Sequence, residues 1–137
     1  MRPLLLFAAL LSGACSREQA AAPEVPKGVF AGAGRNAVCI SVEGSALRAG
    51  VIAYGEGELN CSASGRLEVA NGAPALVPSG ESECRFPLAF AGETVTIAAM
   101  PAGCAYYCAP GATLAGRSFK RSPDAKRATD FAGDPLC

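Results

Sequence analysis

Residues 66–72 read Arg-Leu-Glu-Val-Ala-Asn-Gly, and this stretch predicts the fold of the chain. Polar and apolar side chains alternate from Arg66 to Val69, which is the pattern of a half-buried β-strand. Asn71-Gly72 follows, and this dipeptide strongly favours a two-residue hairpin turn because both residues tolerate a positive φ. The stretch therefore predicts one strand that turns directly into a second, antiparallel strand.

Similar short runs recur on both sides of this hairpin, at a spacing of about 8–12 residues. They lie at 38–42, 51–54, 59–61, 83–88 and 94–98, and none shows sustained helical periodicity. Pro74, Pro78 and Pro87 are expected at strand ends or edges, because proline cannot donate a hydrogen bond to a ladder. We predict a mostly β protein, a small antiparallel β-sandwich or barrel of six to eight strands with an irregular C-terminal tail.

The cysteine content predicts a disulfide framework. The chain has seven cysteines, at positions 15, 39, 61, 84, 104, 108 and 137. If Cys15 is set aside for the reason given below, the remaining six form an even set, which predicts three disulfides without fixing the pairs.

The two-residue period of the strands also orients some of these thiols. Cys61 and Cys84 are in phase with apolar neighbours, so both are expected to face the core. They enclose the predicted hairpin, which makes Cys61–Cys84 the preferred pair. Cys39 is out of phase with Val38 and Ile40 and should face the other side of its strand. We therefore predict at least one disulfide that joins the C-terminal tail to the sheet through Cys39.

The tail begins with a compact aromatic stretch at 101–111, expected to be a loop or a single helical turn. Cys104 and Cys108 lack the C-x-x-C spacing of redox centres, and an oxidising compartment disfavours a zinc site made of thiolates. A structural role in disulfides is the preferred interpretation, with a redox or metal role as the alternative. Tyr106 and Tyr107 are expected to pack against the domain, or alternatively to contact a sugar or a partner.

Charge is balanced in sum and polarised along the chain. The 12 basic and 12 acidic side chains cancel, which argues against general nucleic-acid binding. Acidic residues dominate 56–93, whereas 117–127 is basic. The basic side chains of this second stretch are Arg117, Lys120, Arg121, Lys126 and Arg127. They form either a solvated face beside the acidic sheet or a surface for an anionic partner, such as phospholipid headgroups, lipopolysaccharide or a protein.

The chain contains no histidine, which excludes Ser-His-Asp and Cys-His nucleophile systems. A serine–lysine arrangement would need Lys27, Lys120 or Lys126, and all three lie in segments expected to be exposed, a poor setting for a catalytic base. We therefore predict no catalytic residue, and we expect no cofactor and no metal.

Two carboxylate pairs are the remaining candidates for chemistry. Glu56 and Glu58 flank one predicted turn, and Glu81 and Glu83 flank Ser82 in another. Paired carboxylates carry glycoside hydrolysis, but glutamates at turn tips are ordinarily solvated, which is the preferred interpretation. Gly32-x-Gly34 lacks the strand–helix context of a phosphate-binding loop and indicates a turn or bulge.

The N-terminus predicts export. A positively charged start, an apolar run at 4–11 and small residues before Cys15 are typical of a secretory signal peptide. The run is shorter than the roughly 20 residues that span a bilayer. With a cysteine at the cut, Leu11-Ser12-Gly13-Ala14-Cys15 resembles the lipobox of bacterial lipoproteins, although Ser12 stands where leucine is favoured. The resemblance implies cleavage before Cys15 and acylation, including palmitate, at its thiol. Ordinary cleavage is the alternative.

This resemblance divides the chain into residues 1–14 as signal peptide, 15–27 as lipidated cysteine and flexible tether, and 28–137 as a disulfide-rich β domain. The polar segment after Cys15 contains two prolines and would reach roughly 35–40 Å when extended. Serine at position 16 resembles the sorting pattern of enteric lipoproteins that are delivered to the outer membrane, which implies a domain facing the periplasm.

The function expected is that of a non-catalytic, lipid-anchored cell-envelope protein, a binding or structural module for an unknown envelope protein or glycan. Its architecture resembles that of periplasmic lysozyme-inhibitor lipoproteins, which are also small, lipid-anchored, cysteine-bearing β-barrels. The resemblance covers architecture only and transfers no residue. The alternatives are a periplasmic inhibitor of a lytic enzyme and a thiol–disulfide redox protein acting through Cys104 and Cys108.

Overall fold

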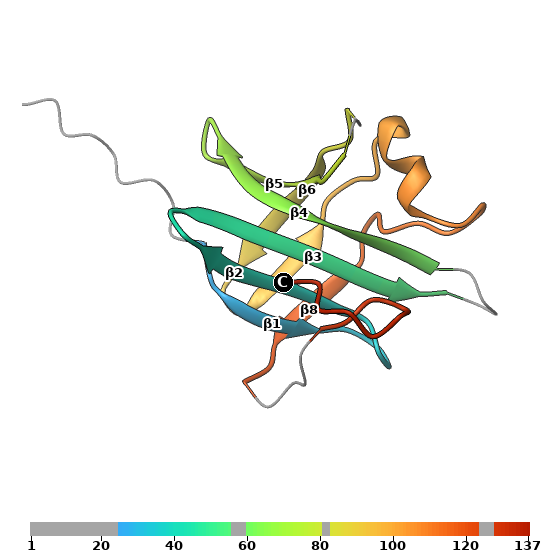
Figure 1. Ribbon diagram of the computed structural model, residues 1–137, viewed down its shortest axis with the longest axis horizontal. Coiled ribbons are helices and arrows are strands. Elements are labelled where there is room, and N and C mark those ends of the chain that lie inside the picture. Colours follow the sequence, from blue (N-terminus) through green and yellow to red (C-terminus); the bar gives the residue numbers. More distant parts are fainter. Residues whose placement is uncertain (1–24, 56–59, 81–82, 124–127) are drawn as a thin grey trace, which may run out of the picture.

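A computed structural model describes residues 25–55, 60–80, 83–123 and 128–137. Each of eight strands pairs antiparallel with the next, and the first also pairs with the last, so the sheet closes into a barrel (Figure 1). The strands are β1 (Gly28–Ala31), β2 (Ala37–Glu43), β3 (Ala46–Tyr54), β4 (Asn60–Ala70), β5 (Ala73–Pro78), β6 (Phe86–Ala91), β7 (Thr94–Ile97) and β8 (Ser118–Arg121). The mostly β prediction is confirmed, and the barrel is the form adopted.

The hairpin predicted at Asn71-Gly72 joins β4 to β5. Both turn residues have a positive φ, 53° at Asn71 and 75° at Gly72, as a tight hairpin turn requires. The three prolines lie near strand ends as expected, since Pro74 and Pro78 are the second and last residues of β5 and Pro87 is the second residue of β6. The strand predicted at 83–88 begins only at Phe86.

Closure of the barrel depends on two short strands that the sequence pattern does not single out. β1 pairs with β2 along its whole length and with β8 at Phe30↔Arg121 and Ala31↔Lys120. β8 lies within the basic stretch and has one buried side chain, Phe119, among four residues. Its strand conformation is therefore set by pairing with β1 and β7 rather than by an alternating pattern of its own.

Side chains from all eight strands fill the barrel interior, as in other small barrels. The largest fully buried ones are Phe30, Phe86 and Phe119. The chain enters β1 at one end of the barrel, where Val25, within the predicted tether, packs into this core. The hairpin turns β2–β3, β4–β5 and β6–β7 lie at the same end, because successive antiparallel strands alternate in direction.

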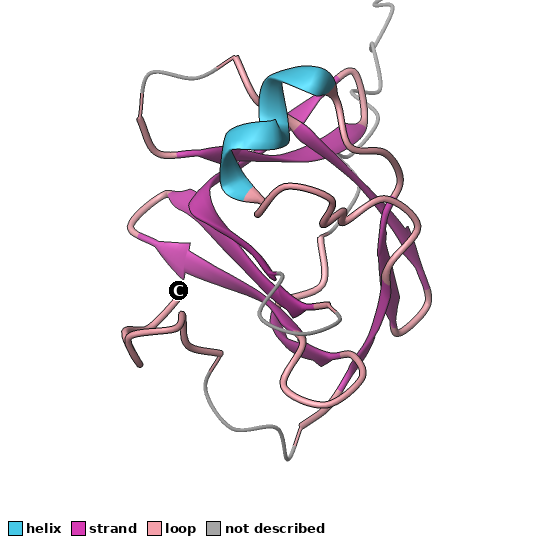
Figure 2. Ribbon diagram, turned by 90° about the vertical axis from the view of Figure 1, so that its right-hand side faces the viewer, coloured by secondary structure: helices cyan, strands magenta, loops and turns pink. Residues whose placement is uncertain are grey.

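The other end of the barrel is covered by the long connection between β7 and β8, residues 98–117, which we call the cap. It contains the 3₁₀-helix η1 (Ala102–Tyr107), so the helical form is the one adopted where a loop or a single helical turn was predicted (Figure 2). Cys104 and Leu114 of the cap are fully buried in the barrel core. Tyr107 packs edge-to-face on Phe86, with ring centroids 6.2 Å apart. The cap therefore extends the interior core beyond the strands.

Three disulfides hold the non-strand segments to the barrel. They join Cys39 to Cys137, Cys61 to Cys108 and Cys84 to Cys104. The predicted link from Cys39 to the tail is confirmed, as is the inward orientation of Cys61 and Cys84. The predicted Cys61–Cys84 pair is wrong. β5 separates β4 from β6, and the cap brings its own two thiols to the same end of the barrel, so each inward cysteine bonds to the cap instead.

Candidate ligand-binding site

The outer face of β1–β3 carries a second, smaller core under the last residues of the chain. Residues 128–137, which we call the terminal segment, bury Ala128 and Leu136 against Ile52 of β3. Gly50 permits this contact, because an added β-carbon there would lie 2.7 Å from both the Cβ and the carbonyl oxygen of Leu136. The Cys39–Cys137 disulfide fixes the segment beside this contact.

A pocket of about 440 Å³ remains between the terminal segment and this face of the barrel. Its lining combines apolar residues of β1 and β2 with polar residues of the β1–β2 turn and the terminal segment. It is lined by Val29, Ala31, Gly34, Arg35, Asn36, Ala37, Tyr54, Ser122, Thr129 and Asp130. A concave site of this size with a few convergent polar groups is the usual form of a small-molecule site.

The β1–β2 turn positions the two polar residues on one side of the pocket. Hydrogen bonds from the Gly32 amide to the Asn36 carbonyl (2.8 Å) and from the Asn36 amide to the Ala33 carbonyl (3.0 Å) close the turn. This agrees with the prediction of a turn at Gly32-x-Gly34. The buried Asn36 side chain accepts a 2.7 Å hydrogen bond from the Tyr54 amide, which links the turn to the end of β3.

Tyr54 is the aromatic residue of the site. The Arg35 guanidinium lies over its ring, 4.3 Å from the centroid, which holds this long cationic side chain in place. Phe131 of the terminal segment packs edge-to-face on the same ring, with centroids 5.2 Å apart. The lining also includes Asp130, whose Oδ1 accepts hydrogen bonds from the Ala132 and Asp134 amides, both 2.9 Å long.

A second, more open hollow continues from the pocket toward the cap. It shares Gly34, Arg35, Asn36 and Tyr54 with the pocket and adds Ala33 and Arg117. The Nε of Arg117 donates a 2.8 Å hydrogen bond to the Thr113 carbonyl of the cap, which holds the guanidinium group in place. Two arginines from distant parts of the sequence therefore line one hollow.

The described residues of the predicted basic stretch do not lie together. Arg117 lies at the cap end, beside Arg35, whereas Arg121 lies at the tether end and approaches Glu93 at 4.0 Å. Lys120 is exposed between them on β8. Lys126 and Arg127 fall outside the described residues, so their part in an anionic surface stays a prediction.

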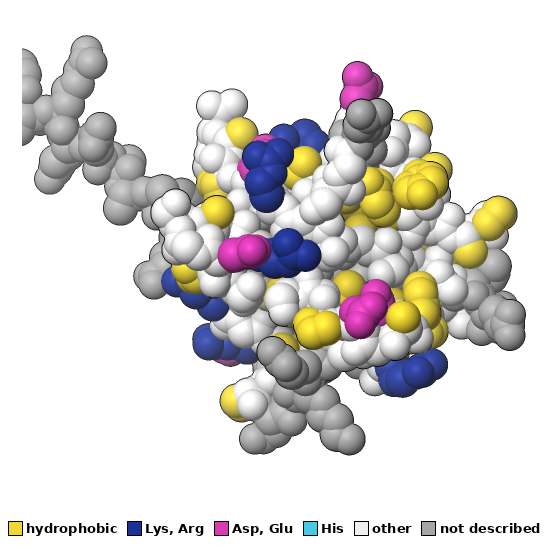
Figure 3. Space-filling model, in the orientation of Figure 1, with side chains coloured by type: hydrophobic (Ala, Val, Ile, Leu, Met, Phe, Trp, Pro, Cys, Tyr) yellow, Lys and Arg dark blue, Asp and Glu magenta, His cyan; other side chains and the backbone are white. Residues whose placement is uncertain are grey.

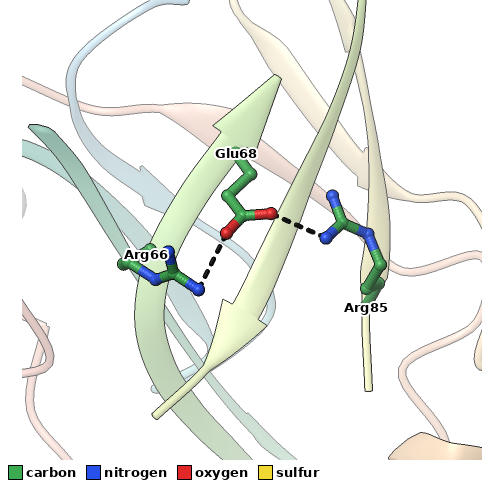
Figure 4. A network of polar contacts seen from close by, with 3 residues as sticks. All are labelled: Arg66, Glu68 and Arg85. Atoms are coloured by element: carbon green, nitrogen blue, oxygen red, sulfur yellow. Dashed lines mark hydrogen bonds and ion pairs between the residues drawn. The ribbon is translucent and has the colours of Figure 1, made fainter. Parts of the chain in front are cut away.

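Several other charges are neutralised locally. Figure 3 shows basic and acidic side chains lying next to each other on the face over β3 and β4. Glu68 of β4 accepts a 2.6 Å hydrogen bond from Arg85 and lies 2.8 Å from Arg66 (Figure 4). The hydrogen bond from Arg85, with the positive charge of Arg66, lowers the pKa of Glu68, although partial burial opposes this shift.

The cap does not have the arrangement of a dithiol redox centre. Cys104 and Cys108 are each bonded to a different part of the barrel rather than to each other, as the structural interpretation predicted. The two neighbouring tyrosines differ in environment. Tyr107 packs on Phe86 as expected, whereas Tyr106 is 89% exposed and contacts only the edge of Tyr107 among the aromatic rings described, with centroids 5.3 Å apart.

Of the two predicted carboxylate pairs, only Glu83 lies among the described residues. Glu83 is exposed, and Glu56, Glu58 and Glu81 lie outside the described residues. Within the described ranges, no group of three potential ligands could hold a metal ion. Among the described residues η1 is the only helix, and none of these residues forms a helix that is long and apolar enough to cross a membrane.

Comparisons with protein-family models, with curated proteins and with solved structures find no significant match for this chain. The assignment of the site therefore depends on its own geometry. Of the charged and aromatic residues that form it, the sequence analysis predicted only Arg117 as a site residue. Arg35, Tyr54 and Asp130 were missed, since each is a single residue in a turn or at a strand end, without a local motif.

Proposed function

We propose that this protein is a non-catalytic, lipid-anchored binding module of the bacterial cell envelope. The observation that carries the proposal is the complete pairing of six cysteines at 39, 61, 84, 104, 108 and 137. The three pairs account for all six cysteines after Cys15, as expected if the Cys15 thiol carries lipid. Three disulfides also suit an oxidising compartment outside the cytosol.

The arrangement of the domain is compatible with such an anchor. The chain enters the barrel through Val25 at the end opposite the cap, and the candidate pocket lies toward the cap. A domain tethered through 15–27 would therefore present its pocket away from the attachment point. Serine at position 16 favours an outer-membrane location facing the periplasm.

The test is an intact mass of the mature protein purified from membranes, with and without reduction. We expect the mass of a chain beginning at Cys15 with a diacylglyceryl group and an acyl group, and a gain of six hydrogens on reduction. Cys15→Ser is the matched control, because it keeps the disulfide set and removes only the acylated thiol. An unmodified N-terminus in the wild type would contradict the anchor.

Inhibition of a lytic enzyme is a second candidate, favoured by the presentation of Tyr106. This side chain projects from a five-residue stretch whose two ends, Cys104 and Cys108, are both bonded to the barrel. A rigid, exposed tyrosine is a good contact residue, because little entropy is lost when it binds. Titration of lysozyme with the wild type and with Tyr106→Ala tests this role, and full lysozyme activity at high molar excess of the wild type would exclude it.

A further inference from the structure

The arginines of the described ranges divide into two groups. Arg48, Arg66, Arg85 and Arg121 each lie within 4.0 Å of a glutamate carboxylate. Arg35 and Arg117 have no carboxylate partner among the described residues, and these are the two that line the same hollow. The unpaired guanidinium groups of this part of the protein are therefore concentrated at one place.

Both side chains are held there by contacts other than an ion pair with a described carboxylate. Stacking on Tyr54 fixes the Arg35 guanidinium, and the Nε–H bond to the cap fixes that of Arg117. The terminal nitrogens of a guanidinium form a planar fork that matches carboxylate and phosphate oxygens. Preorganised donors of this kind reduce the entropy lost when an anion binds.

We propose that the hollow and the adjoining pocket bind a small polyhydroxylated acid, either a sugar acid or a sugar phosphate. The anionic group lies between Arg35 and Arg117, and the uncharged body extends into the pocket beside the terminal segment. Four residues line both the hollow and the pocket, so the two spaces adjoin. The pocket volume of about 440 Å³ is within the range of small-molecule sites.

The other polar side chains of the pocket suit the body of such a ligand. Asp130 repels a second anionic group but accepts hydrogen bonds from ligand hydroxyls, and Ser122 and Thr129 add hydroxyl groups to the same lining. A ligand with one acidic end and a hydroxylated body therefore complements both the arginines of the hollow and the polar residues of the pocket. A neutral sugar would leave the two guanidinium groups without an anionic partner. A dicarboxylic acid long enough to reach into the pocket would bring its second carboxylate close to Asp130.

The inference deepens the proposed binding role and rests on it, but its test does not depend on the anchor. Isothermal titration calorimetry of the mature protein, purified from membranes in detergent, compares glucose, glucuronate and glucose 6-phosphate. These probes share one body and differ in the acidic group. We expect both acids to bind at least about tenfold more tightly than glucose, as charge-assisted hydrogen bonds predict. Their relative affinity distinguishes a carboxylate from a phosphate ligand. The intact mass of the same sample reports on the anchor separately.

Arg35→Gln and Arg117→Gln should each weaken binding of the preferred acid by about tenfold or more. Arg66→Gln is the matched control, because it removes a glutamate-paired arginine elsewhere on the barrel, and it should leave the affinity unchanged. Arg35→Lys keeps the charge but removes the planar fork, so it should bind with intermediate affinity. Asp130→Asn should weaken glucuronate binding while leaving the binding of inorganic phosphate as strong or stronger.

Near-ultraviolet circular dichroism of each variant checks that the barrel is intact. Equal affinity for glucose and the two acids would overturn the proposal. Unchanged affinity in the folded Arg35→Gln and Arg117→Gln variants would also overturn it, as would the absence of binding by either acid up to roughly 10 mM.

Discussion

The cap and the terminal segment are both attached to the barrel by disulfides, but they cover different surfaces. The cap closes one end of the interior, and its residues Cys104 and Leu114 belong to the same core as Phe86. The terminal segment lies on the outside of β1–β3, where it buries Ala128 and Leu136 in a separate core and leaves a pocket beside them. The cap thus completes the interior core, whereas the terminal segment forms part of the lining of the candidate pocket.

The largest effect expected from this difference is the removal of both cap disulfides, by alanine at positions 61, 84, 104 and 108. They close loops of 47 and 20 residues, for which chain entropy gives about 3–4 kcal/mol each. This is comparable with the whole stability of a small domain, about 5–15 kcal/mol. We expect loss of the cooperative urea transition.

The matched variant, Cys39→Ala/Cys137→Ala, removes a cross-link between residues 98 apart and also lowers the free energy of unfolding. We expect it to keep a cooperative transition, with faster hydrogen exchange confined mainly to 128–137. If the variant without the cap disulfides folds and the variant without Cys39–Cys137 does not, the terminal segment contributes more to stability than the cap.

Aromatic truncation separates the two regions by the burial of a single side chain. Phe86→Ala removes a fully buried ring that contacts the cap, and we expect a loss of about 3–5 kcal/mol in the free energy of unfolding. Phe131→Ala removes a ring that is 49% exposed on the terminal segment, so its cost should stay below about 1 kcal/mol. Urea denaturation of both variants measures the difference, and equal losses would show that the second core is as important as the first.

Two glycines allow a comparison with the same substitution. Gly50→Ala would drive a β-carbon against Leu136 and should cost about 1–3 kcal/mol, with hydrogen exchange increased in the terminal segment. Gly103→Ala in the cap meets no atom closer than 3.8 Å, so we expect a change of at most about 1 kcal/mol, in the stabilising direction. If Gly50→Ala is as well tolerated as Gly103→Ala, the terminal segment does not approach β3 closely.

The smallest effect concerns the ion pair between Glu68 of β4 and Arg85 of the β5–β6 connection, next to Cys84, which is bonded to the cap. The Arg85 hydrogen bond lowers the folded-state pKa of Glu68, so the stabilisation is present above the unfolded pKa and is lost as pH falls through the folded value. We expect Glu68→Gln to be slightly less stable than the wild type near neutral pH. The difference should disappear in acid, below the ordinary glutamate range, when unfolding is followed against pH.

Local patterns predicted the parts of the fold that depend on neighbouring residues. The β4–β5 hairpin follows from Asn71-Gly72, and the outward orientation of Cys39 follows from its phase against Val38 and Ile40. The closure of the barrel could not be predicted in the same way, since β1 and β8 are short and meet across about 90 residues of chain. The wrong Cys61–Cys84 pair has the same origin, because only the folded cap brings Cys104 and Cys108 to those thiols.

The candidate site was predictable only in part for a related reason. Arg117 belongs to a basic run that is visible in the sequence, whereas Arg35 is an isolated residue in a turn between glycine and asparagine. The two become neighbours only when β8 pairs with β1 and closes the barrel. No motif or spacing in the sequence indicates that these two arginines are neighbours.

The position of β1 has a mechanical consequence for an anchored domain. Because the chain enters directly into β1, a pull on the tether would load this strand along its own axis. β1 pairs with β2 through four residues and with β8 through two, so the load acts in shear on both ladders at once. In the anchored protein that we propose, a barrel closed at the strand next to the tether would resist tension on that tether.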